Sequence, residues 1–339
     1  MEFRYIGQSG LRVSVICLGT MTFGSTTSKE EAFTILDAAY EAGVNFIDTA
    51  ELYPVPPDAK WAGRTEEIVG EWLKTKPRDS IILATKVAGA ASGWFVPPIR
   101  HGLTAMDRFH IKRAIEGSLR RLGTDYIDLY QMHWPDTVVP IEETMRAFDE
   151  LVKEGKVRYI GTSNDTAYGL TKANMVAKYE GLARFESIQN NFSVLNPRFF
   201  DELETVCRRE KVSLLPYSPN GGGILSGKYN QPFVPEDARF SIYLKHPVKR
   251  VREHAKRFYN EKTLALTEEF LKLAKEAGLH PVTLAVAWSK QFDFVASTIV
   301  GVRKLEQLEA NLAAADVKLE RDIMKKIAAL QQKYCYPMG

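Results

Sequence analysis

The sequence predicts an α/β protein of the (β/α)8 TIM-barrel class, with a β-hairpin before the barrel and an extra helix after it. Eight short apolar runs alternate with segments of helical periodicity, an order typical of a parallel sheet. No Gly-x-Gly-x-x-Gly pattern follows the first of these runs, which favours a closed barrel over a doubly wound sheet. A length of 339 residues is compatible with one such barrel, and we predict a single domain spanning residues 1–339.

The amino-terminal segment has the pattern of a β-hairpin. Residues 2–6 and 11–15 read as two short strands around a turn bounded by Gly7 and Gly10. The first barrel strand is then expected at residues 15–19, where an apolar run ends in glycine.

The remaining elements follow from apolar runs and helical spacing. Further strands are expected at residues 44–48, 81–86, 127–133, 157–163, 185–189, 213–217 and 295–300. Helices are expected at residues 28–42, 65–74, 111–122, 141–151, 198–209, 263–277, 281–291, 305–315 and 320–334, with one more ending near residue 179. Ser28 and Glu31 form a capping-box pattern, and Asn196 with Pro197 marks the start of the helix at 198–209.

Composition excludes several classes of function. A net charge of +3 is too small to indicate binding to nucleic acid or a membrane surface. Cys17, Cys207 and Cys335 lack the spacing of metal ligands, so we expect reduced thiols and no metal site. No stretch resembles a membrane span or a signal peptide, so we expect a cytoplasmic protein, or a stromal one if the chain is a processed plastid protein. The oligomeric state stays open.

Polar side chains occur where the predicted strands end. In a barrel, the carboxyl ends of all strands open on one face, which carries the chemistry. The residues at these ends are Asp48, Lys86, His133, Ser163, Asn164, Gln189, Tyr217 and the segment 301–303. The longer connections at 87–107 and 218–262 also follow strands and are expected to roof this face. We therefore predict the functional site there.

Asp48, Tyr53 and Lys86 together have the chemistry of a proton-donating site. A free tyrosine has a pKa near 10, and a neighbouring ammonium group favours its phenolate. The aspartate would hold that ammonium charged, and His133 would orient a carbonyl oxygen against the phenol. Each residue alone also has an ordinary structural interpretation: a buried ion pair, a packed tyrosine or a core histidine. Four such residues on one rim favour a functional site over these structural interpretations.

These residues resemble the catalytic tetrad of the aldo-keto reductases, whose pattern matches Asp48-Thr49-Ala50-x-x-Tyr53 with Lys86 and His133. Residues 18–24 (Leu-Gly-Thr-Met-Thr-Phe-Gly), residues 155–164 and Tyr217-Ser218-Pro219 resemble further motifs of this family. A narrower likeness to the Tas-type reductases of bacteria and plastids is carried by residues 50–57, by His133-Trp134-Pro135 and by Tyr336-Pro337. The resemblance covers essentially the whole chain.

The resemblance implies NADPH (NADP+)-dependent, reversible reduction of an aldehyde or ketone to an alcohol. Tyr53 would be the general acid, Lys86 would lower its pKa, Asp48 would pair with Lys86, and His133 would orient a small-molecule carbonyl substrate. The implied cofactor-binding residues are Gly19, Thr20, Met21, Asp48, Ser163, Asn164, Gln189, Tyr217, Ser218, Pro219, Asn220, Gly221, Gly222, Lys228, Arg239, Gly301, Arg303, Gln307 and Asn311.

Within that set, the resemblance gives each group of residues a different part of the cofactor. Ser163, Asn164 and Gln189 would hold the carboxamide, and Tyr217 would stack on the nicotinamide. Lys228 and Arg239 would contact phosphate, and Arg303 would bind the 2′-phosphate with its planar guanidinium. The helix that starts near Leu305 is also expected to offer free N–H groups to an anion.

Two positions depart from the family pattern. Ala310 stands where many relatives have glutamate, which leaves the strength of the preference for NADPH over NADH open. Asn220 stands where leucine is frequent and makes the roof of the pocket more polar. The expected substrate pocket consists of Met21, Phe23, Trp94, Trp134 and Asn220. Only five residues follow Tyr334, so we expect an open site with broad tolerance for aldehydes.

Two other functions stay open. One is an NADPH-binding, redox-sensing subunit resembling the potassium-channel β subunits. The other is a barrel isomerase or aldolase that uses Lys86 as a Schiff base, although pairing with Asp48 opposes it, because a nucleophilic lysine must be neutral. The basic stretch at residues 245–257 is expected to be a solvated helix face or a guide for an anionic cofactor, with His246 and His254 at the surface.

Overall fold

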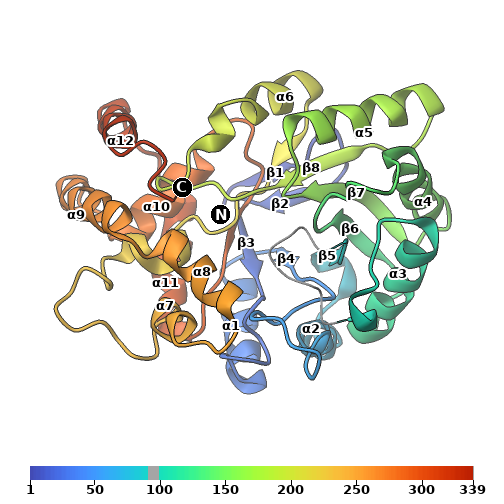
Figure 1. Cartoon of the computed structure of the whole chain (residues 1–339), viewed down its shortest axis with the longest axis horizontal. Helices are drawn as coiled ribbons and strands as arrows, with labels where there is room; N and C mark the ends of the chain where they lie inside the picture. The colour runs from blue at the N-terminus through green and yellow to red at the C-terminus, as the bar shows by residue number, and fades with distance from the viewer. Residues whose placement is uncertain (91–98, 339) are drawn as a thin grey trace.

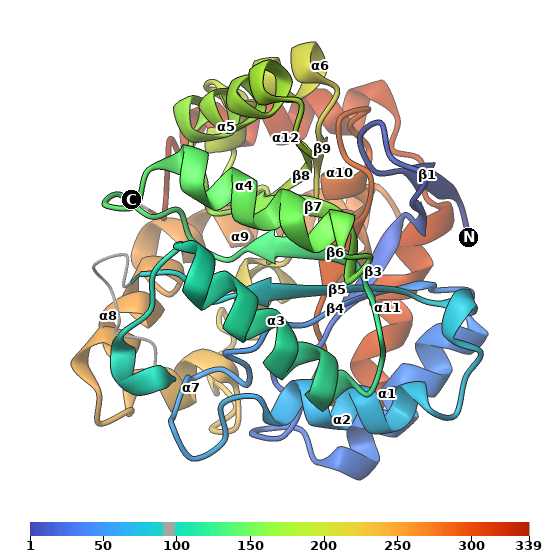
Figure 2. The ribbon, with the colours of Figure 1, turned by 90° about the vertical axis from the view of Figure 1, so that its right-hand side faces the viewer.

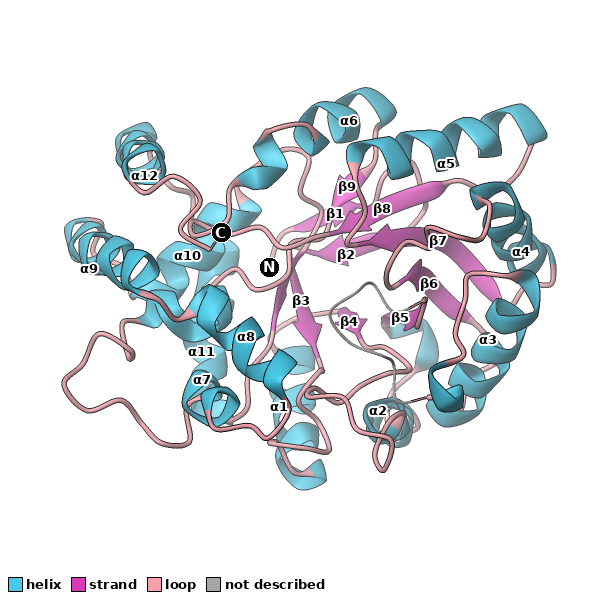
Figure 3. Cartoon of the chain, viewed as in Figure 1, coloured by secondary structure: helices cyan, strands magenta, loops and turns pink. Residues whose placement is uncertain are grey.

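The computed structural model describes residues 1–90 and 99–338, and a closed barrel of parallel strands lies at its centre (Figure 3). The strands are β3 (Ile16–Gly19), β4 (Phe46–Asp48), β5 (Ile82–Val87), β6 (Ile127–Met132), β7 (Val157–Ser163), β8 (Phe185–Gln189), β9 (Ser213–Leu214) and β10 (Thr298–Val300). They form one eight-stranded sheet in the order β10-β3-β4-β5-β6-β7-β8-β9. Parallel bridges from Leu214 to Val295 and from Tyr217 to Ile299 join its two outer strands and close the barrel. The predicted fold class is confirmed.

Helices surround the strands, as Figure 1 shows. They are α1 (Lys29–Glu41), α2 (Arg64–Leu73), α3 (Arg108–Leu122), α4 (Ile141–Lys153), α5 (Ala167–Glu180), α6 (Leu203–Glu210), α7 (Arg239–Leu244), α8 (Lys249–Phe258), α9 (Glu261–Glu276), α10 (Pro281–Lys290), α11 (Leu308–Leu312) and α12 (Arg321–Lys333). Short 3-10 turns are η1 (Arg78–Ser80), η2 (Arg100–Gly102), η3 (Arg198–Phe200), η4 (Gly221–Ser226), η5 (Leu305–Gln307) and η6 (Ala313–Asp316). Within the described ranges, no helix is both long and apolar enough to cross a membrane.

The amino-terminal hairpin closes one end of the barrel. Its strands β1 (Phe3–Tyr5) and β2 (Arg12–Ser14) pair in antiparallel register. The turn between them donates backbone N–H groups to side chains near the amino ends of barrel strands, from Gly7 to Ser213 Oγ (2.8 Å) and from Gln8 to Glu186 Oε2 (2.8 Å). Figure 2 shows the hairpin at one end and α7 and α8 at the other. The carboxyl ends of the strands therefore form the open face.

The hydrophobic core has two parts. The larger part lies between the strands and the surrounding helices. The smaller part fills the barrel interior near the hairpin and includes Ile6, Cys17, Phe46 and Leu129. Because apolar residues fill this end, the polar residues of the interior are gathered toward the open face.

Two predicted helices are interrupted. The segment predicted at 198–209 starts as the turn η3, and α6 begins only at Leu203, because Glu202 has non-helical backbone angles (φ −144°, ψ −44°). The rings of Phe199 and Phe200 pack on Phe192 at 5.8 and 5.1 Å, which fixes this first turn by tertiary packing. The segment predicted at 305–315 likewise divides into η5, α11 and η6.

Candidate active site

Asp48, Lys86 and Tyr53 meet at the carboxyl end of the barrel. Lys86 is completely buried, and its Nζ donates to Asp48 Oδ1 at 2.5 Å and to the carbonyl oxygen of Thr49 at 2.8 Å. The same Nζ lies 3.4 Å from the hydroxyl oxygen of Tyr53. Strands β4 and β5 are neighbours, so the ends of two adjacent strands bring the carboxylate and the ammonium together. The predicted contact among the three side chains is present.

Two glutamine amides hold the other oxygen of Asp48. Its Oδ2 accepts from Nε2 of Gln189 at 2.9 Å and from Nε2 of Gln131 at 3.1 Å. Gln189 also donates to Gln131 Oε1 at 3.2 Å. Gln131 was not predicted as a site residue, although it lies two positions before His133, a spacing that puts both on one face of a strand. Gln189, predicted to hold a carboxamide, is here a partner of Asp48.

The pKa of Tyr53 differs from the expectation based on Lys86 alone. Burial raises the pKa of Tyr53 above its ordinary value, and the Lys86 ammonium opposes that effect only in part. For Lys86, burial opposes the charge, but the Asp48 carboxylate and the Tyr53 phenol outweigh it and raise the pKa. At neutral pH Tyr53 is therefore a protonated phenol beside a charged ammonium. This pair of states suits a proton donor and opposes a Schiff-base lysine.

His133 follows β6 and stands beside the phenol. Its ring stacks on Trp134 at 3.7 Å and meets the Tyr53 ring edge-on at 5.8 Å. Burial, aided by Lys86, lowers the pKa of His133 well below its ordinary value, so the imidazole is neutral. Its Nδ1 is buried and has no hydrogen-bond partner among the described residues. A neutral imidazole with an unused nitrogen can bind a polar group of a ligand without a charge.

Asn164 and Tyr217 are hydrogen-bonded to each other next to His133. The Tyr217 hydroxyl donates to Asn164 Oδ1 at 2.7 Å, and Asn164 Nδ2 donates to the carbonyl oxygen of His133 at 3.0 Å. Ser163 is buried and donates to the carbonyl oxygen of Gln189 at 2.8 Å. Burial raises the pKa of Tyr217 to about 12. The aromatic ring of Tyr217 is thus a neutral surface in a fixed orientation.

The predicted residues that follow β3 and β10 lie on the same rim. Gly19 ends β3, and the side chain of Thr20 is fully buried, with its hydroxyl donating to the carbonyl oxygen of Asp48 at 2.9 Å. Met21 is half-buried, and Gly301 is exposed directly after β10. A Cβ added to Gly301 would lie 3.5 Å from the carbonyl oxygen of Gly19, so the two glycines bring their backbones close together.

A glycine turn follows Tyr217 in the chain, and the cations Lys228, Arg239 and Arg303 lie near it. Gly221, Gly222 and Gly223 all have positive φ (56°, 65° and 100°), which side chains other than glycine rarely adopt. A Cβ on Gly223 would lie 3.0 Å from Lys228 Nζ, and one on Gly222 would lie 3.7 Å from an Arg239 guanidinium nitrogen. The turn therefore lies against both cations.

These cations are poorly neutralised by the protein. Burial, with Arg239 and Arg303 nearby, lowers the pKa of Lys228 to about 8. Lys228 and Arg239 form no ion pair with any residue in the described ranges, and Arg303 has only Asp237 at 3.7 Å. A cluster of like charges favours an anion.

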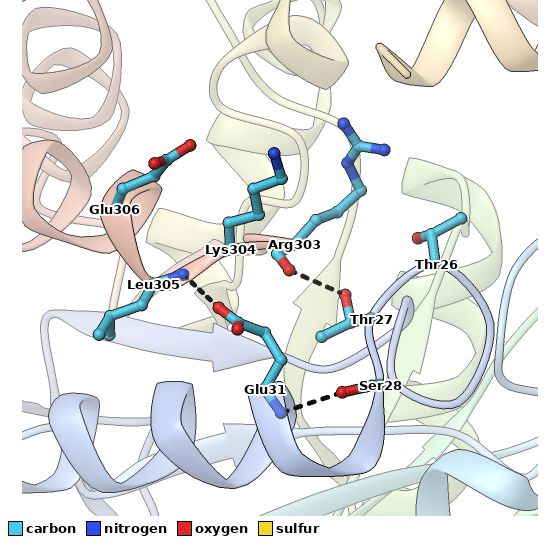
Figure 4. A pocket seen from close by; sticks show the side chains of 8 residues that line it. All are labelled: Thr26, Thr27, Ser28, Glu31, Arg303, Lys304, Leu305 and Glu306. Atoms are coloured by element: carbon cyan, nitrogen blue, oxygen red, sulfur yellow. Dashed lines mark hydrogen bonds between the residues drawn. The ribbon is translucent and has the colours of Figure 1, made fainter.

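The prediction that the segment after β10 offers free N–H groups to an anion needs correction. A cavity of about 400 Å³ lies between it and α1, lined by Thr26, Thr27, Ser28, Glu31, Arg303, Lys304, Leu305 and Glu306 (Figure 4). Glu31 accepts the backbone N–H of Leu305 at 2.7 Å, so one of the N–H groups that were expected to bind an anion is already occupied. The element there, η5, is also only three residues long. Only the Ser28 half of the predicted capping box forms, by accepting the N–H of Glu31 at 3.2 Å.

Asn220 and Asn311 form a polar pair beside Gly221. Asn220 Nδ2 donates to Asn311 Oδ1 at 3.1 Å, and Asn311 Nδ2 donates to the carbonyl oxygen of Gln307 at 2.7 Å. Asn220 Oδ1 is buried without a partner among the described residues. Ser218 precedes it in a left-handed conformation (φ 56°), and Pro219 is buried. A buried orphan acceptor next to a glycine turn and a cation cluster fits a nucleotide with amino and phosphate groups.

The residues predicted for the substrate pocket differ in how far they are buried. Trp134 is 8% exposed beside His133, and Met21 is half-buried. The prediction for Phe23 is wrong, because its side chain is completely buried in the main core and reaches no open surface. Trp94 lies outside the described residues. Among residues 1–90 and 99–338 there is no His, Cys, Asp or Glu cluster that could hold a metal ion.

The basic stretch forms helix α8 at the open end of the barrel (Figure 1). Lys249, Arg250, Lys256 and Arg257 are exposed, as expected for a solvated face. His254 was expected at the surface but is half-buried, with its ring 5.1 Å from Phe258. Burial lowers the pKa of His254 to about 4.

Known proteins are similar in sequence to this chain over nearly its whole length. Residues 15–332 match the model of the aldo/keto reductase family. The chain is 37% identical to the protein tas of Escherichia coli (strain K12) over 99% of each chain. It is 34% identical to the uncharacterized oxidoreductase YrpG of Bacillus subtilis (strain 168), over 96% of this chain and 95% of that one. It is 32% identical to a probable voltage-gated potassium channel subunit beta of Oryza sativa subsp. japonica, over 98% and 97%. The predicted likeness to Tas-type proteins is confirmed, and the chain belongs to the aldo/keto reductase family.

Proposed function

We propose that this protein is an oxidoreductase that reduces aldehydes and ketones to alcohols with NADPH. The observation that carries the proposal is the contact of a protonated Tyr53 hydroxyl with the Lys86 ammonium at 3.4 Å, on the open face of the barrel. The family match and an oxidoreductase among the relatives support it.

In this reaction the side chains handle one proton and one developing negative charge. A reduced nicotinamide, when bound, supplies the hydride that reaches the carbonyl carbon. Tyr53 donates its hydroxyl proton to the carbonyl oxygen, and Lys86, held by Asp48, stabilises the phenolate that remains. Neutral His133 donates a hydrogen bond to the same oxygen and fixes its direction.

The preference for NADPH follows from the cation cluster. Lys228, Arg239 and Arg303 gather positive charge beside a turn of three glycines, where a phosphate can approach the backbone. Asn164, Ser163 and Tyr217 offer a fixed polar and aromatic surface next to the phenol. Asn220 and Asn311 lie beside the glycine turn and suit the adenosine half.

A cofactor titration and a substrate panel test the proposal. We expect the purified protein to bind NADPH more tightly than NADH by fluorescence, and to oxidise NADPH when aldehydes of several sizes are supplied. Turnover of several unrelated aldehydes would agree with an open pocket, and turnover of one alone would contradict the expected tolerance. Binding of neither nucleotide, or no oxidation of NADPH with any carbonyl compound, would refute the proposal.

Cofactor affinity should depend on pH through Lys228. Its pKa of about 8 is lowered, so it loses its proton as the pH rises through 8, whereas a bound phosphate favours the charged form. We expect the affinity for NADPH to change little up to pH 7, to fall by about twofold at pH 8 and to fall by up to about tenfold per pH unit above it. Fluorescence titrations from pH 7 to 9.5 measure this. A Lys228→Met variant should bind more weakly at pH 7 and lose this slope, and an unchanged slope would contradict the assignment.

A regulatory, NADPH-binding subunit is the second candidate. Three relatives named as voltage-gated potassium channel β subunits are 32% identical to this chain, which favours this candidate over a Schiff-base isomerase or aldolase. Such a protein would bind NADPH as tightly as the enzyme does and yet oxidise it negligibly with every carbonyl compound supplied. The two measurements above therefore separate the candidates.

A further inference from the structure

A buried glutamate lies two residues before Tyr53 and has no part in the proposed proton transfer. Glu51 is 2% exposed. Its Oε1 accepts the N–H of Ala88 at 2.7 Å and Nη2 of Arg100 at 2.6 Å, and its Oε2 accepts Nη1 of Arg100 at 3.0 Å. This is a two-pronged guanidinium–carboxylate pair, the geometry in which an ion pair is most directional. Both carboxylate oxygens are engaged.

Glu51 is hydrogen-bonded to the end of β5 at Lys86 and to Ala88 directly after it. Its backbone N–H donates to the carbonyl oxygen of Lys86 at 3.2 Å, while its carboxylate accepts from Ala88, two residues further on. Tyr53 belongs to the same turn, because its N–H donates to the carbonyl oxygen of Ala50 at 3.1 Å. One side chain thus connects the turn that carries the phenol to the strand that carries the ammonium.

Arg100 reaches Glu51 from a backbone that is itself unusual. Arg100 and His101 have φ of 48° and 55°, the left-handed region that residues other than glycine rarely adopt. Such a conformation is kept only where contacts with the surrounding structure hold it in place. The surroundings here are the pair with Glu51, a contact of Arg100 Nη2 with His110 Nε2 at 3.2 Å, and the hydroxyl of Thr104 donating to the carbonyl oxygen of Gly89 at 2.7 Å.

We propose that Glu51 and Arg100 are positioning residues that set the distance between the Tyr53 hydroxyl and the Lys86 ammonium. The phenol comes from the connection after β4 and the ammonium from strand β5, and their separation of 3.4 Å is at the long limit of a hydrogen bond. A small movement of the connection that carries Tyr53 relative to β5 therefore breaks the contact. The inference rests on the proposed carbonyl reduction, in which a misplacement of about 1 Å costs about 10²-fold in rate.

A purely structural role predicts something different. Removing one partner of a buried ion pair lowers the stability of the fold, but a contribution to stability alone would leave the rate per folded molecule unchanged. A positioning role lowers kcat and spares cofactor binding, because the phosphate-facing cations lie in other connections, after β9 and β10.

The test uses Glu51→Gln, Arg100→Met, the double variant and Arg100→Lys in the full-length protein. We expect each of the first two to lower kcat by about 10- to 100-fold, with KM and the Kd of NADPH changed by less than about threefold. The double variant should be no slower than the slower single variant, because both changes break one interaction. Arg100→Lys keeps the charge and should recover part of the rate.

The matched control is the exposed pair of Arg64 and Glu67 on α2, whose separation is 3.0 Å. Arg64→Met and Glu67→Gln should leave kcat unchanged. An unchanged kcat in Glu51→Gln and Arg100→Met, or a loss that only matches the loss of folded protein by circular dichroism, would overturn the inference.

A second measurement does not need turnover. Tyrosine labelled with 13C at Cζ gives a resonance for Tyr53, assigned by its loss in Tyr53→Phe, whose shift at pH 7 reports hydrogen bonding to the hydroxyl. We expect this resonance to move in Glu51→Gln and to stay in Glu67→Gln. A wild-type protein that reduces no carbonyl compound would refute the proposed function, while an unmoved Tyr53 resonance would refute the positioning role.

Discussion

Tyr53→Phe is expected to lower kcat for carbonyl reduction by about 10²- to 10⁴-fold, the contribution typical of a positioned general acid. The substitution removes only the hydroxyl that lies 3.4 Å from Lys86 and keeps the ring that packs edge-on against His133. Steady-state oxidation of NADPH with a substrate aldehyde measures the effect. The Kd of NADPH should change by less than about threefold, because Tyr53 touches none of the three cations.

Tyr217→Phe is the matched control, since it also removes one buried tyrosine hydroxyl near the site. That hydroxyl donates to Asn164 rather than to Lys86, so its loss should weaken cofactor binding and leave the chemical step largely intact. If Tyr53→Phe retained wild-type kcat, another group would have to be the proton donor.

Lys86→Met is expected to lower the free energy of unfolding by about 3–5 kcal/mol, because it leaves a buried carboxylate without its cation. Asp48 is 2% exposed and would keep only the amides of Gln131 and Gln189 as hydrogen-bond donors. Urea denaturation measures the loss. Activity should also disappear, since the phenolate formed at Tyr53 would have no stabilising charge.

The double variant Asp48→Asn/Lys86→Met separates the two effects. It removes both charges, so most of the stability should return while the activity does not. A Lys86→Met protein as stable as the wild type would show that Asp48 is protonated or hydrated there. A double variant with restored turnover would contradict the role of Lys86.

Much of the fold could be predicted because apolar periodicity and capping residues are local signals. The eight strands, the hairpin and the helix that ends at Leu122 all follow from short segments of sequence. The convergence of Asp48, Lys86 and His133 could be predicted as well, because a barrel brings strand ends to one rim. The breaks at Glu202 and in the 305–315 segment could not, because tertiary packing rather than local propensity determines them.

The parts of the site that escaped prediction depend on distance and burial. The raised pKa of Tyr53 results from burial outweighing an ammonium, a balance that spacing along the chain does not reveal. Glu51 was not predicted as a site residue, because its partner Arg100 lies far away in the sequence. Phe23 was predicted to line the substrate pocket, yet its side chain is buried in the core.

The pairing of β3 with β10 has a consequence for biosynthesis. Ile16 pairs with Thr298, so the first barrel strand to leave the ribosome waits for nearly the whole chain before its open edge is covered. During that interval the unpaired N–H and C=O groups of β3 can pair with another nascent chain. Contacts of such long range also slow folding. Closure of the barrel therefore depends on its last strand. A nascent chain that stops before β10 keeps an unpaired strand edge that can pair with another chain.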